Sequence, residues 1–324
     1  MNLKRNIVVV VFFIVAASLG IIIYVVPGIL DAFTKTFVAS YDTFQVTDDA
    51  DFYIVREESV YLAKSEGKLS YYFEQGEMVR KDTQILKVHP SQVPEAYKED
   101  VYKDLRTDLG QGAKVQGSYL AEASGIISYY IDGYEYFFRP ENLEGITYEN
   151  IPKTLREPVN LSREYTLTEE PLYKVTRYQK WYLLSFAKPD SIGKYEIGKT
   201  VTLYLPKGDI RGEIVEITPS GERYKIVIST NMYYPDFSVI RKVGAVVLSS
   251  DYKGILVPND SITVNEGKTG VYIINKRKQK VFTEIKVLAS DGITSCIEVE
   301  SFIDENGIKV DTVDIYDTIV RRPN

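Results

Sequence analysis

Hydrophobic and polar positions follow distinct patterns in different parts of the chain. Near the N-terminus the pattern is a long apolar run. Residues 7–26 form twenty consecutive positions without a charged side chain, and Lys4 and Arg5 precede them. A helix of that length spans a bilayer core of about 30 Å. The pattern predicts a single-pass anchor in the cell membrane, with a cytoplasmic N-terminus and the bulk of the chain extracytoplasmic. A cleaved signal peptide is the alternative, but the apolar run continues further than such a peptide needs.

From Trp181 onward, short segments alternate between apolar and polar residues. The alternation is clearest at residues 201–205 and 224–228, and turn-forming residues separate these segments. A period of two is typical of half-buried strands. Strands at this spacing predict a small β-barrel over residues 177–250. A further β module is expected over residues 251–324.

One segment instead shows helical spacing. Tyr97, Val101, Leu105 and Leu109 recur at every fourth position, between a proline and a glycine that suit the two ends of a helix. The spacing predicts one amphipathic helix of about 16 residues, or roughly 24 Å. It lies within an insertion at residues 91–112.

An internal repeat precedes the predicted barrel. Residues 67–74 (GKLSYYFE) and 125–132 (GIISYYID) share a glycine, a serine, two tyrosines and a final acidic residue. The end of each unit also recurs, since residues 85–88 (ILKV) resemble residues 172–175 (LYKV). Two similar β units predict a small sandwich with approximate two-fold symmetry, in which each half covers the other. Chance recurrence in a chain with 26 tyrosines is the alternative.

These residues resemble a known family. Residues 66–67, 75–81 and 85–88 are similar to the first half of a lipoyl/biotinyl-type hammerhead, and residues 123–127 and 132–135 to the start of its second half. A split hammerhead behind an N-terminal anchor resembles the HlyD-type membrane fusion, or periplasmic adaptor, proteins of efflux systems. Residues 173–175 and 180–183 then resemble the exit into the family's barrel, and residues 257–273 its membrane-proximal domain.

The resemblance implies a mainly β fold: an N-terminal transmembrane helix, a split lipoyl-like β-sandwich with one short inserted helix, a small β-barrel and a C-terminal membrane-proximal β domain. The expected segments are a cytoplasmic tip and anchor at 1–30, a connecting segment with a first strand at 31–58, the hammerhead at 59–176 with insertions at 91–112 and 134–165, the barrel at 177–250, and the membrane-proximal domain at 251–324.

No cofactor is implied. In lipoyl and biotinyl domains the modified lysine lies at the tip between the two halves, where this chain has His89 and Pro90. Lys87 and Lys174 occupy equivalent repeat positions, and we expect both to be solvated strand residues.

No catalytic or metal-binding constellation stands out, and the sequence predicts a protein that is not an enzyme. One His and one Cys do not make a His/Cys zinc site, and Cys296 lies among apolar residues as a buried thiol would. Asp48, Asp49 and Asp51 lack the spacing of a calcium loop, so we expect a solvated linker. A carbohydrate-active enzyme is a weaker option, because its two catalytic carboxylates can be far apart in the sequence and come together only in the fold.

Two further segments have alternative interpretations. Residues 134–165 lack a clear period, which is typical of a functional or mobile loop. The aromatic residues at its start, Tyr134, Tyr136, Phe137 and Phe138, are expected in the core rather than on a binding ledge. The basic run 275–280 is expected to be a solvated hairpin tip, with contact to anionic headgroups or an acidic partner as the alternative.

The net charge of the chain indicates which class of partner it binds. The chain has 45 acidic residues against 39 Lys and Arg, a net charge of −6. Without Lys4 and Arg5, 37 basic residues remain against 45 acidic ones, which gives −8. Nucleic-acid binding needs a basic surplus, so the expected partners are proteins, and the membrane is contacted through residues 7–26.

The sequence and the resemblance together predict a non-enzymatic adaptor subunit of an efflux or secretion transporter. The implied partner is an integral-membrane transporter, either an ABC or a proton-driven pump, and a homo-oligomer is a further option. Residues 60–176 would dock distally and residues 251–324 close to the transporter. The alternative is a cell-envelope or division-associated scaffold, because one short helix cannot form the long hairpin of adaptors that reach an outer-membrane duct.

Overall fold

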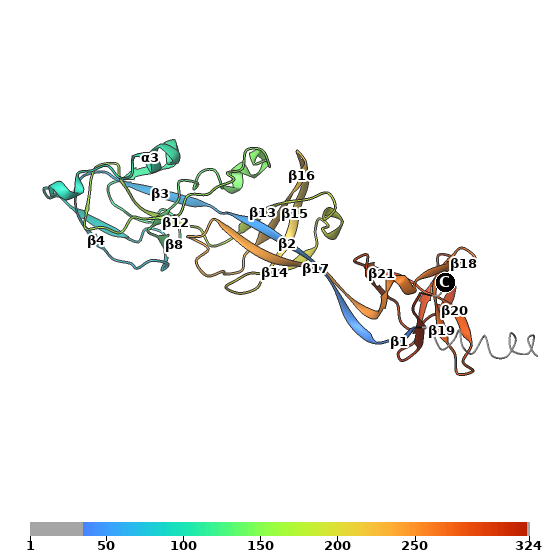
Figure 1. Ribbon diagram of the computed structural model, residues 1–324. Helices are drawn as coiled ribbons and strands as arrows, with labels where there is room; N and C mark the ends of the chain where they lie inside the picture. Colours follow the sequence, from blue (N-terminus) through green and yellow to red (C-terminus); the bar gives the residue numbers. More distant parts are fainter. Residues whose placement is uncertain (1–34, 323–324) are drawn as a thin grey trace, which may run out of the picture. The chain divides into compact units, whose positions relative to one another are not determined.

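The computed structural model describes residues 35–322, so the predicted membrane span at 7–26 lies outside the described residues. Within 35–322 no helix is long and apolar enough to cross a bilayer. The chain divides into two compact units, one formed by Val46–Ser250 and one by Met1–Gln45 with Asp251–Asn324. Both are built almost wholly of strands, which confirms the prediction of a mainly β protein (Figure 1).

The first part of unit Val46–Ser250 is a sandwich of two sheets, together with a small strand pair. The larger sheet has the order β5 (Met78–Val79), β8 (Gly125–Ser128), β12 (Pro171–Thr176), β3 (Glu58–Ala63) and β7 (Lys114–Gln116); the smaller has the order β11 (Tyr165–Thr166), β4 (Gly67–Tyr71) and β6 (Leu86–His89). Strands β9 (Tyr130–Ile131) and β10 (Val159–Asn160) pair separately. A core of buried aliphatic and tyrosine side chains lies between the sheets.

The predicted repeat is confirmed by strand register. Leu69 and Ser70 of β4 pair with Val88 and Lys87 of β6, as Ile127 and Ser128 of β8 pair with Val175 and Lys174 of β12. Equivalent residues of the two halves therefore have equivalent partners on the neighbouring strand.

The repeat-equivalent residues Tyr71 and Tyr129 meet edge to face in the core of the sandwich. Their ring centroids are 5.1 Å apart, which is a favourable geometry for an aromatic pair. The two halves thus contact each other through the same residue of the repeat.

The second part of this unit is a closed β-barrel. Its strands follow the order β14 (Thr200–Tyr204), β15 (Ile210–Ser220), β16 (Arg223–Thr230), β13 (Trp181–Ala187), β2 (Tyr41–Val55) and β17 (Lys242–Pro258), and pairing of β14 with β17 closes the ring. Closure removes the free edges of a small sheet. Trp181 and Phe52, both fully buried, are among the residues of its core. The aspartates at 48, 49 and 51 lie within strand β2 and not in a linker, but Asp49 and Asp51 are exposed as predicted.

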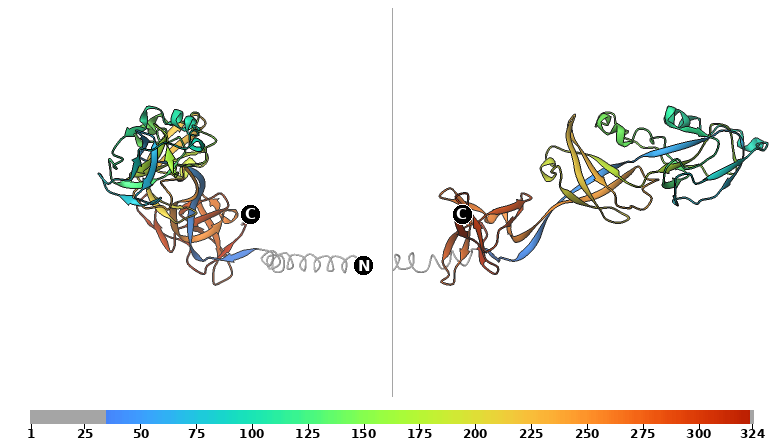
Figure 2. Two further views of the ribbon diagram at one scale, coloured as in Figure 1. Left: turned by 90° about the vertical axis from the view of Figure 1, so that its left-hand side faces the viewer. Right: turned by 180° about the vertical axis from the view of Figure 1, so that it is seen from behind.

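The segment predicted as a loop insertion at 134–165 packs against the barrel. It contains the 3-10 helix η4 (Pro140–Gly145), and Phe138 is fully buried, as expected for a core residue. The Tyr148 amide donates to the Ser220 hydroxyl at 2.8 Å, and Lys225 Nζ donates to the Leu143 carbonyl at 2.9 Å. In both Figures 1 and 2 the green segment lies beside the yellow strands of the barrel.

The single helix predicted between residues 94 and 109 is wrong. The structure has a 3-10 turn, η2 (Glu95–Tyr97), and a separate seven-residue helix, α3 (Lys103–Leu109). Tyr102, Leu105 and Leu109 are buried, whereas Val101 is 65% exposed. The side chains that pack on the sandwich therefore follow a spacing of three and four, starting from Tyr102. Gly110 ends α3 as predicted, with its amide directed at the carbonyls of Arg106 and Thr107, and the 3-10 turn η3 (Gly110–Gly112) follows.

The other compact unit is also a β module. One sheet contains β1 (Thr36–Val38), β25 (Thr318–Val320), β19 (Lys268–Ile274), β18 (Thr263–Asn265) and β20 (Lys280–Glu284). Strands β21 (Val287–Ser290) and β22 (Thr294–Ile297) pair with each other and β22 with the end of β17, while β23 (Ser301–Ile303) pairs with β24 (Lys309–Asp311). Short 3-10 turns occur at η5 (Ile192–Lys194) and η6 (Asn259–Ser261) in the two units respectively. The basic run 275–280 forms the turn between β19 and β20, as predicted.

Substitution of Gly125 by alanine should destabilise the sandwich by about 1–3 kcal/mol, because the added Cβ would lie 2.4 Å from the Thr176 carbonyl oxygen on the paired strand. Gly145→Ala is the matched control, since a Cβ there meets nothing within 4 Å, and its effect should stay within about 0.5 kcal/mol. Thermal and urea unfolding followed by circular dichroism measures both. Equal stability of the two variants would contradict this close strand packing.

Candidate functional site: a buried charge cluster between sandwich and barrel

The chain passes twice between the barrel and the sandwich, and charged residues flank both crossings. Arg56 lies between β2 and β3, Glu58 is the first residue of β3, and Lys174 lies near the end of β12, before the chain enters β13. Asp132 and Glu135 follow β9, and Arg241 directly precedes β17. These six side chains form what we call the charge cluster: Arg56, Glu58, Asp132, Glu135, Lys174 and Arg241. Each of them is at most 4% exposed.

Glu58 is the centre of the charge cluster. One carboxylate oxygen, Oε1, lies 3.0 Å from Arg56 Nε and 2.7 Å from Lys174 Nζ. The other, Oε2, lies 2.8 Å from Arg241 Nη2. A single carboxylate therefore contacts three cations that come from three separate segments of the chain.

Arg241 joins this centre to the turn after β9. Its guanidinium contacts Asp132 through two hydrogen bonds, Nε to Oδ2 at 2.8 Å and Nη2 to Oδ1 at 3.0 Å. Such bidentate pairs fix the relative orientation of the two groups. Glu135 in turn accepts the backbone amides of Asp132 and Gly133, each at 3.0 Å, and lies 3.1 Å from Lys174 Nζ.

Arg56 reaches from the crossing strand into the loop that leads to β17. It donates to the carbonyl oxygens of Phe237, Ile240 and Ser238, the second at 2.6 Å and the third at 3.3 Å. The Arg56 guanidinium therefore supplies hydrogen-bond donors to three backbone carbonyls next to it. The charge cluster thus links the barrel loop before β17, both crossing strands and the turn after β9.

The three cations and three carboxylates of the cluster balance each other. Burial of an ion costs several kcal/mol, which opposite charges and hydrogen bonds in good geometry offset. Burial alone would raise the pKa of Glu58, but Arg241, Arg56 and Lys174 together outweigh it and hold that pKa far below its usual value. Burial of Asp132 is likewise outweighed, mainly by Arg241, and its pKa is lowered.

Glu135 differs from the other two carboxylates. Burial is the largest influence on it and exceeds the attraction of Lys174, so the pKa of Glu135 is raised. Its surroundings therefore favour the neutral form more than those of Glu58 do.

Apolar packing reinforces the same junction. Ile126 of the sandwich is part of the barrel core that includes Trp181. The inserted segment adds Phe138, whose ring stacks on Tyr53 of β2 at a centroid distance of 5.5 Å. The Tyr53 hydroxyl donates to the carbonyl of Pro152 at 3.4 Å. Sandwich, insert and barrel are thus continuous in their packing.

The two repeat-equivalent lysines have different surroundings. Lys87 is exposed, as expected for a solvated strand residue, but its repeat-equivalent Lys174 is 1% exposed and paired with two carboxylates. The prediction of a solvated Lys174 is therefore wrong, because the second half of the repeat faces the barrel. Among the residues at 35–322, no three His, Cys, Asp or Glu side chains are placed to hold a metal ion.

The other residues discussed from the sequence are dispersed. His89 is exposed at the end of β6. Cys296 is fully buried in β22, where burial raises the pKa of its thiol. Asp48 accepts Lys194 Nζ at 2.7 Å and the Tyr195 hydroxyl at 2.9 Å, and Asp51 pairs with Lys242 at 2.7 Å. None of them belongs to the charge cluster.

Comparison with known proteins gives two family matches that follow the architecture. Residues 58–176 match the model described as "RND related, barrel-sandwich hybrid domain", and residues 181–251 match "RND related, beta-barrel domain". The chain therefore carries both RND-related domains, in the order that the resemblance to membrane fusion, or periplasmic adaptor, proteins predicts. This family is a non-enzymatic class, and its members act outside the cytoplasm.

Solved structures in this family share low sequence identity with the chain. ZneB from Cupriavidus metallidurans is 12% identical, with 90% of this chain and 93% of that one covered and a TM-score of 0.32. MacA from Actinobacillus actinomycetemcomitans is 11% identical, with 88% and 99% covered and a TM-score of 0.42. The membrane fusion protein Spr0693 from Streptococcus pneumoniae R6 is 9% identical, with 64% and 98% covered and a TM-score of 0.28. No curated protein matches the sequence.

Replacement of Glu58 by glutamine should cost about 3–5 kcal/mol of unfolding free energy, because three buried cations lose their shared carboxylate. Glu135→Gln is the matched comparison: Glu135 has one cation within 3.1 Å, Lys174, whereas Glu58 contacts three, so the loss should be clearly smaller. Trp181 is the single tryptophan and is fully buried in the barrel. Its fluorescence during urea unfolding therefore reports on both variants, and equal losses would refute the central role of Glu58.

Proposed function

We propose that the chain is a membrane-anchored adaptor subunit of an efflux or secretion transporter, and that it docks to the transporter outside the cytoplasmic membrane. The family assignment supports an adaptor role, and the observation that carries the proposal is the continuous packing of a barrel-sandwich hybrid domain on a β-barrel domain. In this proposal residues 7–26 anchor the chain, with the N-terminus in the cytoplasm.

The expected segments take distinct roles in this proposal. The hammerhead at 59–176 supplies the distal docking surface through residues 60–176, and the barrel at 177–250 carries it. The domain at 251–324 contacts the transporter, which would be an ABC or proton-driven pump. An assembly of several adaptor copies is compatible with this arrangement.

The proposed mechanism is mechanical rather than chemical. An adaptor that binds one conformation of the transporter more tightly than another shifts the transporter toward the first. The charge cluster supports this role, because a sandwich fixed to its barrel can transmit a displacement at one end to the other. A free hinge at the same place would absorb it.

A second candidate is a cell-envelope or division-associated scaffold that keeps the adaptor fold. The length of α3 favours it, since seven residues span about 10 Å and form no long hairpin. The same observation is compatible with a transporter that lacks an outer-membrane component.

Site-specific photocrosslinking in intact cells should distinguish the two functions. Tyr316, which is 82% exposed in the unit proposed to face the transporter, is replaced by a photoreactive phenylalanine analogue in the full chain. The adaptor proposal predicts a crosslink to an integral-membrane transporter subunit, and Tyr173, fully buried, is the control position that should give none. Recovery of wall or division proteins without any transporter subunit would overturn the adaptor proposal in favour of the scaffold.

A further inference from the structure

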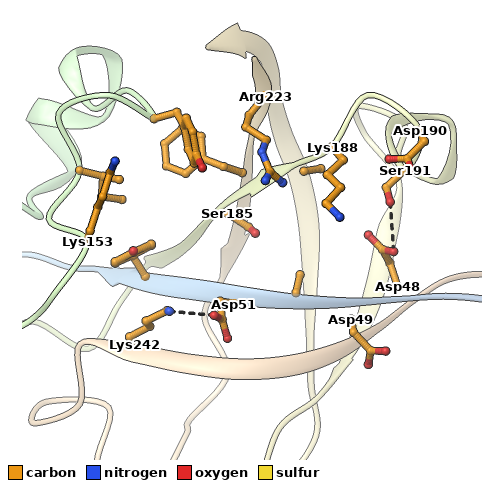
Figure 3. Close-up of a pocket in the computed structure, with 16 residues that line it drawn as sticks. Asp48, Asp49, Asp51, Lys153, Ser185, Lys188, Asp190, Ser191, Arg223 and Lys242 are labelled. Atoms are coloured by element: carbon orange, nitrogen blue, oxygen red, sulfur yellow. Dashed lines mark hydrogen bonds and ion pairs between the residues drawn. The ribbon is translucent and has the colours of Figure 1, made fainter. Parts of the chain in front are cut away.

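A surface cleft lies where the inserted segment meets the barrel. Its volume is about 650 Å³, within the range of roughly 300–1,000 Å³ that is typical of small-molecule sites. Tyr148 and Lys153 of the insert form one wall, and strands β2, β13 and β16 form the others. Figure 3 shows this cleft with the side chains that line it.

Three cations at the cleft have no carboxylate partner among the residues that the structure describes. They are Arg223 at the start of β16, Lys188 just after β13, and Lys153 of the insert. Figure 3 shows the side chains of Arg223 and Lys188 directed into the same space above strand β2. Two like charges that converge repel each other unless an anion lies between them.

Two of the four carboxylates that line the cleft are paired with a lysine. Asp48 is paired with Lys194, a residue outside the cleft lining, and Asp51 with Lys242, each at 2.7 Å. Asp49 and Asp190 are exposed, and in Figure 3 the Asp49 side chain leaves β2 on the side away from Arg223. Lys153 and Lys188 are exposed as well, whereas Arg223 is half-buried and has no ion-pair partner among the described residues.

The same space has an aromatic wall. The Tyr148 ring lies 5.6 Å from the Phe186 ring, centroid to centroid. Arg223 lies 5.3 Å from the Tyr148 centroid, a cation–π distance that holds the guanidinium in place without satisfying its N–H donors. A planar body against these rings would place an acidic group within reach of Arg223 and Lys188.

We propose that this cleft is a binding site for a small organic anion, which pairs a carboxylate or phosphate group with Arg223 and Lys188 and packs a ring against Tyr148 and Phe186. Guanidinium groups bind both kinds of oxyanion in a bidentate manner. Such a ligand touches the insert and the barrel at once. Its binding therefore stabilises the packing of the insert on the barrel by mass action.

The test uses the purified full chain and four probes in isothermal titration at low ionic strength. Phenyl phosphate and benzoate carry a ring with the two kinds of anion, inorganic phosphate carries the anion alone, and phenol carries the ring alone. The proposal predicts saturable binding of phenyl phosphate or benzoate, at least about tenfold tighter than either partial probe. The stronger of the two ring anions identifies the preferred acidic group.

The variants Arg223→Gln and Lys188→Gln should each weaken binding about tenfold, which corresponds to 1.4 kcal/mol. Arg223→Lys keeps the charge but loses the bidentate geometry, so its affinity should lie between those of Arg223→Gln and the unaltered chain. Lys87→Gln, an exposed cation on β6 of the sandwich, is the control and should bind like the unaltered chain. Thermal unfolding of each variant verifies that the fold is retained.

Two outcomes would overturn the proposal. The first is no saturable binding of any ring anion by the unaltered chain at about 10 mM, a concentration at which even weak specific sites are occupied. The second is the same affinity in a folded Arg223→Gln, Lys188→Gln double variant as in the unaltered chain, because binding would then occur elsewhere. Neither outcome bears on the adaptor function, so the two proposals fail independently.

Discussion

A single buried carboxylate, that of Glu58, is the constraint on which the arrangement of sandwich and barrel depends. It contacts Arg56, Lys174 and Arg241, and these cations come from the two crossings and from the loop before β17. A displacement of the sandwich relative to the barrel would separate buried opposite charges, at a cost of several kcal/mol. A purely apolar interface tolerates small shifts more readily, because hydrophobic contact has no preferred direction. The charge cluster therefore favours one orientation.

The inserted segment extends this constraint across the outside of the barrel. It begins just after Asp132, contains Glu135, and packs Phe138 onto Tyr53 of β2. Its backbone is then held at two further points by Ser220 and Lys225. A long segment with little regular structure is uncommon in a compact domain unless it has a role. Here it couples the turn that carries two of the cluster's carboxylates to strands β15 and β16, and it forms one wall of the cleft beside Arg223.

Much of the architecture was predictable from the sequence, because it depends on local pattern. Glycine, serine and tyrosine recur at equal positions in the two halves, and the two serines pair with the equivalent lysines, Lys87 and Lys174. The helix was less predictable, because apolar residues at every fourth position do not show which of them pack on the sandwich. The charge cluster had no local signal at all. Arg241 and Glu58 are 183 positions apart in the sequence. The repeat led to a wrong prediction for Lys174, because equivalent positions of the two halves face different surroundings.

The most direct test of the account is a distance measurement across the junction. Spin labels at Lys87→Cys on β6 and Glu213→Cys on β15, both exposed positions, are introduced into the full chain with Cys296→Ser, and double electron–electron resonance gives the distribution of distances. The account predicts one narrow distribution, and a broader one when Glu58→Gln is added while Glu135→Gln leaves it narrow. A broad distribution without the cluster substitutions, or an unchanged narrow one with Glu58→Gln, would contradict the claim that the charge cluster fixes the sandwich on the barrel.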